Sequence, residues 1–180
     1  MPTAQFDSPL QQRSAALLGM WAFLATEVMF FGPLFFGYLH ARAYQGEAFV
    51  QASHHTNLWL GTANTAILLT SSLTMALAVH ESKANLRKRF LLFTALLGLA
   101  FLCIKAVEYA AEWSEPASLF LFLYFAMTGL HAVHLAIGIA LVLWVAGRPA
   151  ATGIVGLYWH FVDIVWIFLY PMLYLLERYR

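Results

Sequence analysis

Charged residues are scarce in this 180-residue sequence, and their scarcity excludes most soluble classes of protein. Only 11% of the residues are charged, whereas 62% are hydrophobic and 16% are aromatic. Soluble domains are typically about 25% charged and about 45–50% apolar. The net charge of +1 offers no basic surface for phosphates, and the sequence contains no nucleic-acid-binding motif. The composition therefore indicates a membrane protein that does not bind nucleic acid.

Cysteine is nearly absent too, since Cys103 is the single one. A lone cysteine cannot form a disulfide within the chain, and in an apolar run we expect it to act as a small buried hydrophobic residue. The N-terminal residues also lack a basic stretch followed by a short apolar core, so no signal peptide is predicted. We expect residues 1–16 to be an N-terminal cytoplasmic segment.

Long apolar runs are abundant. A helix needs about 20 mainly apolar residues to cross a bilayer, and five segments have that length. Short polar or Gly- and Pro-containing joints separate them, which leaves no room for a soluble domain. The sequence therefore predicts an all-α fold, an integral membrane bundle of five transmembrane helices within residues 17–180. The predicted spans are Leu17–Leu39, Leu58–Val79, Phe90–Tyr109, Ala117–Ala146 and Ile154–Leu176.

The basic residues of the short loops predict the orientation of these helices, because cytoplasmic loops are enriched in Lys and Arg. With five crossings, Arg42, Arg178 and Arg180 fall on one side of the membrane. A larger group falls on the other side, which places the N-terminus inside and the C-terminus outside. This group comprises Arg13, Lys83, Arg87, Lys88, Arg89 and Arg148.

The second span carries small residues at every fourth position, a pattern that lets helices approach closely in lipid. We interpret this stripe as a packing surface. Asn64 lies on the same helix, and its amide needs hydrogen-bonding partners that lipid cannot supply. Asn64 should therefore face a neighbouring helix or another subunit. The stripe comprises Thr62, Ala66, Thr70, Thr74 and Ala78.

Ionisable residues within membrane spans are energetically costly, so each suggests a function. At a rise of 1.5 Å per residue, Glu27, His134 and Asp163 all lie roughly 12–18 Å deep, and we expect them to share one polar layer. Glu27 has two open interpretations: a structural carboxyl bonded to a neighbouring helix, or a proton-linked or subunit-contact carboxyl. The full set comprises Glu27, Lys105, Glu108, His131, His134, His160 and Asp163.

Three pairs of these residues are spaced i, i+3, which places each pair on one helix face and favours mutual hydrogen bonding. The pairs are His131 with His134, His160 with Asp163, and Lys105 with Glu108. A di-iron site would need Glu-x-x-His repeats, which the membrane glutamates lack, so we favour a buried polar network over a metal site.

Residues near the span ends have more ordinary interpretations. We expect Lys105 to extend its ammonium towards the lipid headgroups. Trp59, Tyr174 and Tyr179 are expected to anchor the helix ends at the membrane interface.

Five motifs, in order from Leu17 to the C-terminus, resemble subunit III of the haem–copper respiratory oxidases, the cytochrome c oxidase subunit III family. Each motif is weak alone, but five in the same order are specific. The motifs are Gly19-Met20-Trp21 leading to Thr26-Glu27-Val28-Met29-Phe30-Phe31, Asn64-Thr65-Ala66-Ile67-Leu68-Leu69-Thr70-Ser71, Glu108-Tyr109, Thr128-Gly129-Leu130-His131-Ala132-Val133-His134, and Tyr158-Trp159-His160-Phe161-Val162-Asp163-Ile164-Val165-Trp166.

The resemblance implies a supporting subunit in a bacterial cytoplasmic membrane, without a catalytic residue, cofactor or metal of its own. In the family the haems and copper belong to subunits I and II, while subunit III packs on subunit I and supports proton uptake. Glu27 then corresponds to the family's membrane-embedded glutamate. The other signature polar positions correspond to Glu108, His131, His134, His160 and Asp163.

Two departures from the family pattern matter. Well-known members have seven helices and this sequence matches the last five, which indicates a five-helix bacterial form and puts the family's lipid-holding cleft in question. Lys105 stands where mitochondrial-type members carry glutamine, which weakens any role carried over to Glu108. Membrane lipids and a further respiratory complex are additional expected partners.

Two alternative functions stay open at this point. An accessory subunit of a nitric oxide reductase is one, because five-helix relatives accompany those enzymes. A small transporter is the more remote one, since the sequence contains neither an internal repeat nor paired broken helices.

Overall fold

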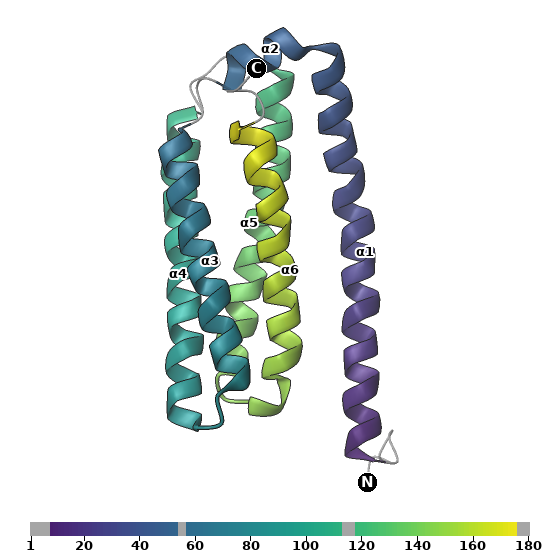
Figure 1. The fold of residues 1–180 in the computed structure, drawn as a ribbon, viewed down its shortest axis with the longest axis vertical. Helices are drawn as coiled ribbons and strands as arrows, with labels where there is room; N and C mark the ends of the chain where they lie inside the picture. Colours follow the sequence, from purple (N-terminus) through teal and green to yellow (C-terminus); the bar gives the residue numbers. More distant parts are fainter. Residues whose placement is uncertain (1–7, 54–56, 113–117, 176–180) are drawn as a thin grey trace.

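The protein is described here by a computed structural model, in which residues 8–53, 57–112 and 118–175 are placed and form an all-helical arrangement (Figure 1). Five helices are long and apolar enough to cross a membrane, which confirms the predicted fold class. The helices are α1 (Pro9–Tyr44), α2 (Gly46–Ser53), α3 (Leu58–His80), α4 (Ala84–Glu112), α5 (Leu119–Val145) and α6 (Thr152–Tyr170). The 3₁₀ turn η1 (Pro149–Ala151) precedes α6, and the π-helical turn η2 (Pro171–Leu175) follows it.

Side-chain caps set the start of three of the spanning helices. The Ser8 hydroxyl accepts a hydrogen bond from the backbone N–H of Gln11, and Ser118 accepts one from Leu121 in the same way. The Asn57 carbonyl oxygen accepts from Trp59 and Leu60. These bonds satisfy backbone donors that the first turn of a helix leaves without a partner.

The helix boundaries differ from the prediction at the start of α1, at the end of α6 and at the start of α4, which begins at Ala84 rather than Phe90. α1 begins at Pro9 rather than Leu17, because Ser8 caps it and Pro9 suits the first turn. The short helix α2 was not predicted, since it is too short to give a clear apolar period. Pro33 lies inside α1, which continues through it without a break. α6 gives way to a π-helical turn at Pro171.

Helices α3 to α6 form a four-helix bundle, and α1 lies to one side against α6 (Figure 1). Glycines bring the bundle helices close together. A Cβ built on Gly98 of α4 would lie 2.8 Å from the Trp159 ring of α6, and one on Gly61 of α3 would lie 2.9 Å from Tyr174. In α1, by contrast, a Cβ on Gly19, Gly32 or Gly37 would meet nothing within 4 Å. The bundle is therefore closely packed, whereas α1 is attached more loosely.

The stripe of small residues on α3 is only partly a packing surface. Thr74 and Ala78 are buried, but Thr62, Ala66 and Thr70 are exposed. Thr62 still contacts α6 through the Tyr170 hydroxyl, which lies 2.8 Å from its own. Ala66 and Thr70 leave the buried face, because a four-residue spacing drifts around a helix of 3.6 residues per turn, and for these two the prediction was wrong. Asn64, Leu68, Ser71, Met75 and Ala78 follow the face that is buried.

Cys103 is also exposed, on the outer surface of α4, so the expectation that it is buried was wrong. The apolar residues around Cys103 could not show whether it is buried in the core or faces lipid, because a lipid-facing surface is as apolar as a core.

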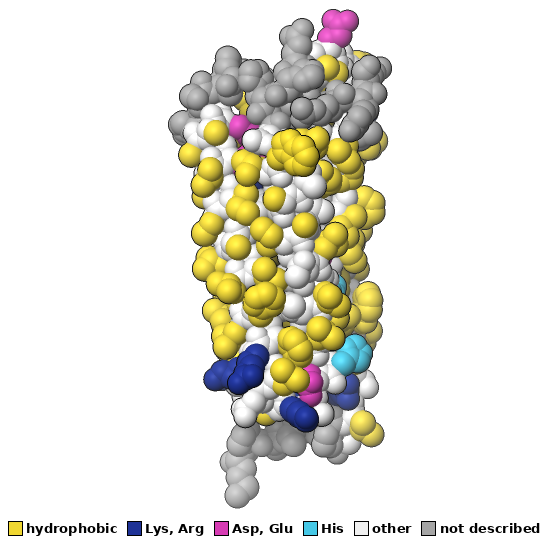
Figure 2. All heavy atoms as spheres, turned by 60° about the vertical axis from the view of Figure 1, so that its left-hand side comes forward, with side chains coloured by type: hydrophobic (Ala, Val, Ile, Leu, Met, Phe, Trp, Pro, Cys, Tyr) yellow, Lys and Arg dark blue, Asp and Glu magenta, His cyan; other side chains and the backbone are white. Residues whose placement is uncertain are grey.

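The outer surface matches a membrane-spanning bundle. Figure 2 shows a flank dominated by hydrophobic side chains, with Lys and Arg gathered at one end. Arg13 near the start of α1, the residues of the α3–α4 joint and Arg148 after α5 all belong to this end. The termini of the described chain lie at opposite ends of the bundle, as an odd number of crossings requires (Figure 1).

Candidate functional site: polar clusters among the helices

Glu27 of α1 and His134 of α5 form a pair between two helices that are far apart in sequence. Nε2 of His134 lies 3.0 Å from Oε2 of Glu27, and the two side chains are 14% and 16% exposed. Nδ1 of His134 lies 2.8 Å from the carbonyl oxygen of Leu130. The Tyr158 hydroxyl donates to the carbonyl of His134 itself. α1 therefore joins α5 through a polar contact near the middle of the length of α1.

The chemistry of this pair follows from its partners. A carbonyl oxygen only accepts hydrogen bonds, so Nδ1 of His134 must carry a proton. Nε2 and the Glu27 carboxyl then share a single further proton, either as a carboxylic acid donating to a neutral imidazole or as a carboxylate accepting from an imidazolium. Either arrangement gives one hydrogen bond between the two side chains, and this bond requires the proton to stay between them.

Lys105 lies at the centre of a second cluster, near the end of the bundle away from the basic loops. Its Nζ donates to Glu108 Oε2 at 3.0 Å, to the Tyr124 hydroxyl at 2.9 Å and to the Tyr174 hydroxyl at 2.7 Å. The Tyr174 hydroxyl also donates to the other carboxyl oxygen of Glu108. These contacts join α4, α5 and η2.

This geometry contradicts the expectation that Lys105 reaches the headgroups, since its side chain is only 3% exposed. Tyr174 is buried as well rather than anchoring the interface. The three hydrogen bonds and the Trp166 ring 5.2 Å from Nζ replace the hydration that the ammonium loses. Tyr179, the other predicted C-terminal anchor, lies outside the described residues, whereas Trp59 is highly exposed near the start of α3.

His160 and Asp163 of α6 form a third cluster with Ser72 of α3. Nδ1 of His160 lies 2.9 Å from the Ser72 hydroxyl and 3.8 Å from Asp163 Oδ2. Asp163 is buried, and no described residue hydrogen-bonds its carboxyl oxygens. The predicted pairing of His160 with Asp163 thus brings the two together without a hydrogen bond of ordinary length.

Glu27, His134 and Asp163 were expected to form a single polar layer, but the structure divides them between two separate sites. Glu27 and His134 meet between α1 and α5, whereas Asp163 lies with His160 at the seam of α3 and α6. Helix depth was predicted from residue counts, but the side on which each residue lies depends on helix rotation, which residue counts do not provide.

His131 and Asn64 are enclosed in the core. His131 is 1% exposed, and its ring centroid lies 5.5 Å from that of Phe101 and 5.1 Å from that of Trp166. Neither ring nitrogen has a hydrogen-bond partner among the described residues, so the predicted bonding between His131 and His134 was wrong. Asn64 faces the bundle interior as expected, although none of the described residues bonds its amide.

Tyr124, Tyr174 and Ser72 are polar partners that sequence reasoning missed. Tyrosine near a helix end is the usual sign of an interface anchor, and serine within an apolar span gives little signal. The break at Pro171 could have indicated Tyr174, because the turn that follows redirects its side chain into the bundle.

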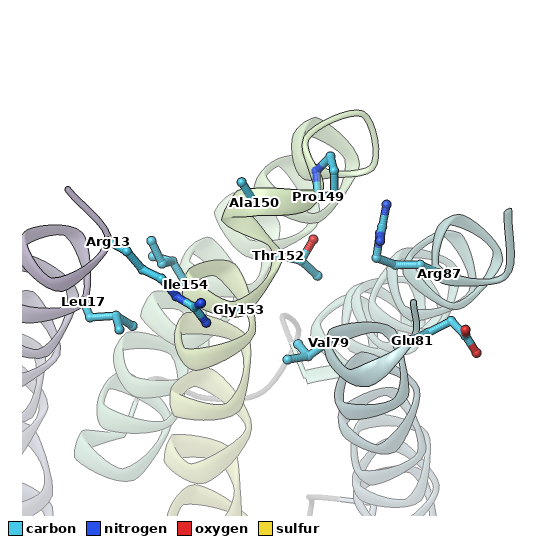
Figure 3. Close-up of a pocket in the computed structure, with 10 residues that line it drawn as sticks. All are labelled: Arg13, Leu17, Val79, Glu81, Arg87, Pro149, Ala150, Thr152, Gly153 and Ile154. Carbon is cyan, nitrogen blue, oxygen red and sulfur yellow. The ribbon is translucent and has the colours of Figure 1, made fainter. Parts of the chain in front are cut away.

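A cavity of about 320 Å³ opens at the basic end of the bundle, between α1, the α3–α4 joint and the start of α6 (Figure 3). Arg13 extends from α1 towards Gly153 and Ile154, and Arg87 lies across the opening. The buried hydroxyl of Thr152 has no hydrogen-bond partner among the described residues. Two arginines and the carboxylate of Glu81 therefore line the cavity together.

These features define a class of protein, a multi-pass integral membrane protein with several ionisable side chains enclosed between its helices. Across the described part of the chain, no three His, Cys, Asp or Glu side chains gather into a metal-binding group. The family model described as "Cytochrome c oxidase subunit III" matches residues 10–177. The chain belongs to the cytochrome c oxidase subunit III family, which confirms the resemblance seen in its motifs.

Individual relatives agree. The chain is 33% identical to a protein of Thermostichus vulcanus named "Cytochrome c oxidase subunit 3", with 91% of this chain and 88% of the relative covered. It is 32% identical to the protein of the same name from Alkalihalophilus pseudofirmus, with 88% and 85% covered. It is 31% identical to a "Probable quinol oxidase subunit 3" of Staphylococcus haemolyticus, with 97% and 95% covered.

Proposed function

We propose that this chain is the supporting subunit III of a haem–copper terminal oxidase, which passes electrons to oxygen and translocates protons. The family match over residues 10–177 carries this proposal. The relatives named above are oxidase subunits, and this favours an oxidase over a nitric oxide reductase. In this role the chain packs on subunit I, and the haems and copper reside in subunits I and II.

Glu27 and His134 are the residues we propose to support proton uptake. Their shared proton lies between α1 and α5 at mid-membrane depth, where a carboxyl or imidazole without a partner would be costly. A carboxyl and an imidazole that share one proton are groups suited to proton exchange, and neither of them transfers electrons.

The basic end of the bundle is proposed to face the cytoplasm of a bacterial cell, which places the N-terminus inside. Membrane lipids are proposed partners there, because Arg13 and Arg87 line the cavity of Figure 3 and offer positive charge to a phosphate headgroup.

Affinity purification from membranes tests the proposed function. A tagged chain should copurify with haem-bearing subunits, and the reduced-minus-oxidised spectrum of the complex should show oxidase haems. The isolated chain should contain less than one iron or copper atom per polypeptide by metal analysis. Purification of the wild-type chain free of any haem-bearing partner would refute the proposal, as would one firmly bound metal per chain that is lost in His131→Ala or His134→Ala.

A further inference from the structure

The seam between α3 and α6 is lined by three polar contacts. The Thr62 and Tyr170 hydroxyls lie 2.8 Å apart at one end. The indole N–H of Trp166 donates to Thr65 at 3.0 Å in the middle, and Ser72 meets His160 at 2.9 Å at the other end. α3 and α6 lie in front of α4 and α5 in the view of Figure 1. Thr62 and Leu69 of α3 and Ile167 of α6 are exposed, so this seam lies at the surface of the bundle.

His160 is the unusual residue on this surface. Its side chain is 36% exposed, and no described residue hydrogen-bonds its Nε2. It lies eight residues into α6, about 12 Å along the helix from Thr152, and therefore within a hydrocarbon layer about 30 Å thick. Lipid tails at that depth cannot hydrogen-bond an imidazole, so exposure to lipid would be costly.

Asp163 lies beside His160 in the same cluster, with 3.8 Å between its carboxyl and Nδ1 of the imidazole. The carboxyl is 3% exposed, yet neither oxygen has a hydrogen-bond partner among the described residues. A side chain that docks on the seam can reach only the imidazole, whose side chain is 36% exposed, because the carboxyl is enclosed in the bundle. Glu27 differs, because its carboxyl already bonds to His134 within the chain.

The surface around His160 suits a helix. Leu69 and Leu73 of α3 and Ile167 of α6 are each about half exposed, and Ile167 follows His160 by seven residues, two turns along the same face. The exposed small residues Thr62 and Ala66 of α3 extend this surface. Small residues next to apolar ones let a transmembrane helix approach closely.

We infer that the α3–α6 seam is the docking surface for a transmembrane helix of a partner oxidase subunit, and that a hydrogen-bonding side chain on this helix bonds to His160 Nε2. The inference rests on the proposed function, since it takes the partner to be a subunit of the same complex. In this arrangement His160 and its neighbours contact the partner subunit, whereas Glu27 pairs with His134 inside this chain. A protein helix fits better than lipid, because it can present a polar side chain at this depth.

Cross-linking in the intact complex tests the location of the contact. In a Cys103→Ser background, Leu73→Cys and Ile167→Cys on the seam are labelled with a thiol-reactive benzophenone and illuminated in native membranes. Val107→Cys on α4 and Val133→Cys on α5 are matched controls at exposed apolar positions. The seam variants should cross-link to a haem-bearing subunit, and the controls should not. Cross-links from the controls alone, to a second copy of this chain, or to lipid alone would overturn the inference.

A substitution tests the hydrogen bond itself. His160→Leu should weaken retention of this chain on the haem-bearing subunits about three- to tenfold during detergent purification, the scale of interhelical hydrogen bonds in membranes. His80→Leu removes an exposed histidine near the end of α3 and should leave retention unchanged. The amount of each variant in membranes and its own melting temperature show whether it folds. Wild-type retention of a folded His160→Leu variant would overturn the inference.

The two failures can be told apart. If the wild-type chain copurifies with haem-bearing subunits but cross-links to them only from α4 or α5, the docking surface is wrong and the proposed function stands. If the wild-type chain copurifies with no haem-bearing subunit, the proposed function itself fails.

Discussion

Helix α1 and the bundle of α3 to α6 are equally able to span a membrane, yet they are held in different ways. In the most apolar stretch of α1, only 11% of the residues are buried, compared with 61% in the segment that contains α6. The bundle helices approach so closely that glycines are needed, as Gly98 against Trp159 shows. α1 instead relies on a few contacts, among them Glu27 with His134 and the Tyr38 hydroxyl with the Met172 carbonyl.

The polar clusters differ in the same way. The Lys105 cluster lies within the bundle, with the ammonium bonded to three side chains of its own chain. The Glu27–His134 pair is partly exposed and joins α1 to α5, beside the ring contacts of Phe31 and Phe35 of α1 with α6. Ionisable residues in one membrane protein can therefore have different structural roles. The Lys105 cluster stabilises the interior of the bundle, whereas the Glu27–His134 pair links the loosely packed helix α1 to the bundle.

The largest expected effect is at Lys105. Lys105→Met leaves the Glu108 carboxyl buried without its cation, and breaking a buried ion pair in this way typically costs about 3–5 kcal/mol. The free energy of unfolding in mixed micelles is the measurement, and Lys83→Met at an exposed lysine is the control. Equal stability of the two variants would contradict the view of Lys105 as the centre of the core cluster.

The next effect compares glycines. Gly98→Ala places a Cβ 2.8 Å from the buried Trp159 ring, and overpacking of this kind costs about 1–3 kcal/mol. Gly19→Ala in α1 meets nothing within 4 Å, and it should be neutral or up to about 1 kcal/mol stabilising because alanine favours helices. The same unfolding assay measures both. A destabilised Gly19→Ala with an unchanged Gly98→Ala would reverse the proposed difference in packing.

A smaller effect is expected at Glu27. Glu27→Ala removes the bond to His134, and interhelical hydrogen bonds average about 0.6 kcal/mol in membranes, so the attachment of α1 should loosen about threefold. The haem spectrum of the complex should be unchanged, while oxygen consumption over many turnovers should fall. Glu27→Gln should be milder, because the amide keeps the shape and much of the hydrogen bonding.

Glu47→Ala on α2 is the control, since Glu47 is an exposed glutamate. Sustained turnover that is equal in Glu27→Ala, Glu47→Ala and wild type would remove the basis for a proton-supporting role of the pair.

The smallest perturbation tests orientation. In a Cys103→Ser background, Asn85→Cys at the basic end should react with a membrane-impermeant thiol reagent only from the cytoplasmic side. Gln45→Cys, between α1 and α2 at the other end, should react only from outside. The reverse labelling pattern would invert the predicted topology, and neither variant should change stability.

Much of the fold could be predicted because a membrane imposes strong local constraints. Apolar runs of about 20 residues located the five spanning helices, although α1 begins at Pro9 rather than Leu17. α2 could not be predicted, because eight residues with a mixed pattern carry too little signal. The i, i+3 spacing predicted the Lys105–Glu108 pair correctly, since both residues lie on one helix.

Contacts between helices were harder to predict. Because Lys105 lies near a helix end, its ammonium was expected to reach the lipid headgroups. It is instead buried in the bundle, where it donates hydrogen bonds to Tyr124 and Tyr174 from other segments. His131 lies on the same face of α5 as His134, yet it packs between Phe101 and Trp166 rather than bonding to its neighbour. Local spacing states which face a residue occupies, but not which helix that face meets.

By itself, the sequence determined the number of spanning helices, the positions of the ionisable residues along them and the family, because hydropathy, spacing and motif order are properties of single segments. The tertiary structure decided the rest. It alone showed that Glu27 meets His134, that Lys105 is buried and that His160 lies at a surface seam. The physical reason is that lipid-facing and core-facing surfaces are equally apolar, so the rotation of each helix is set by packing between helices rather than by hydropathy.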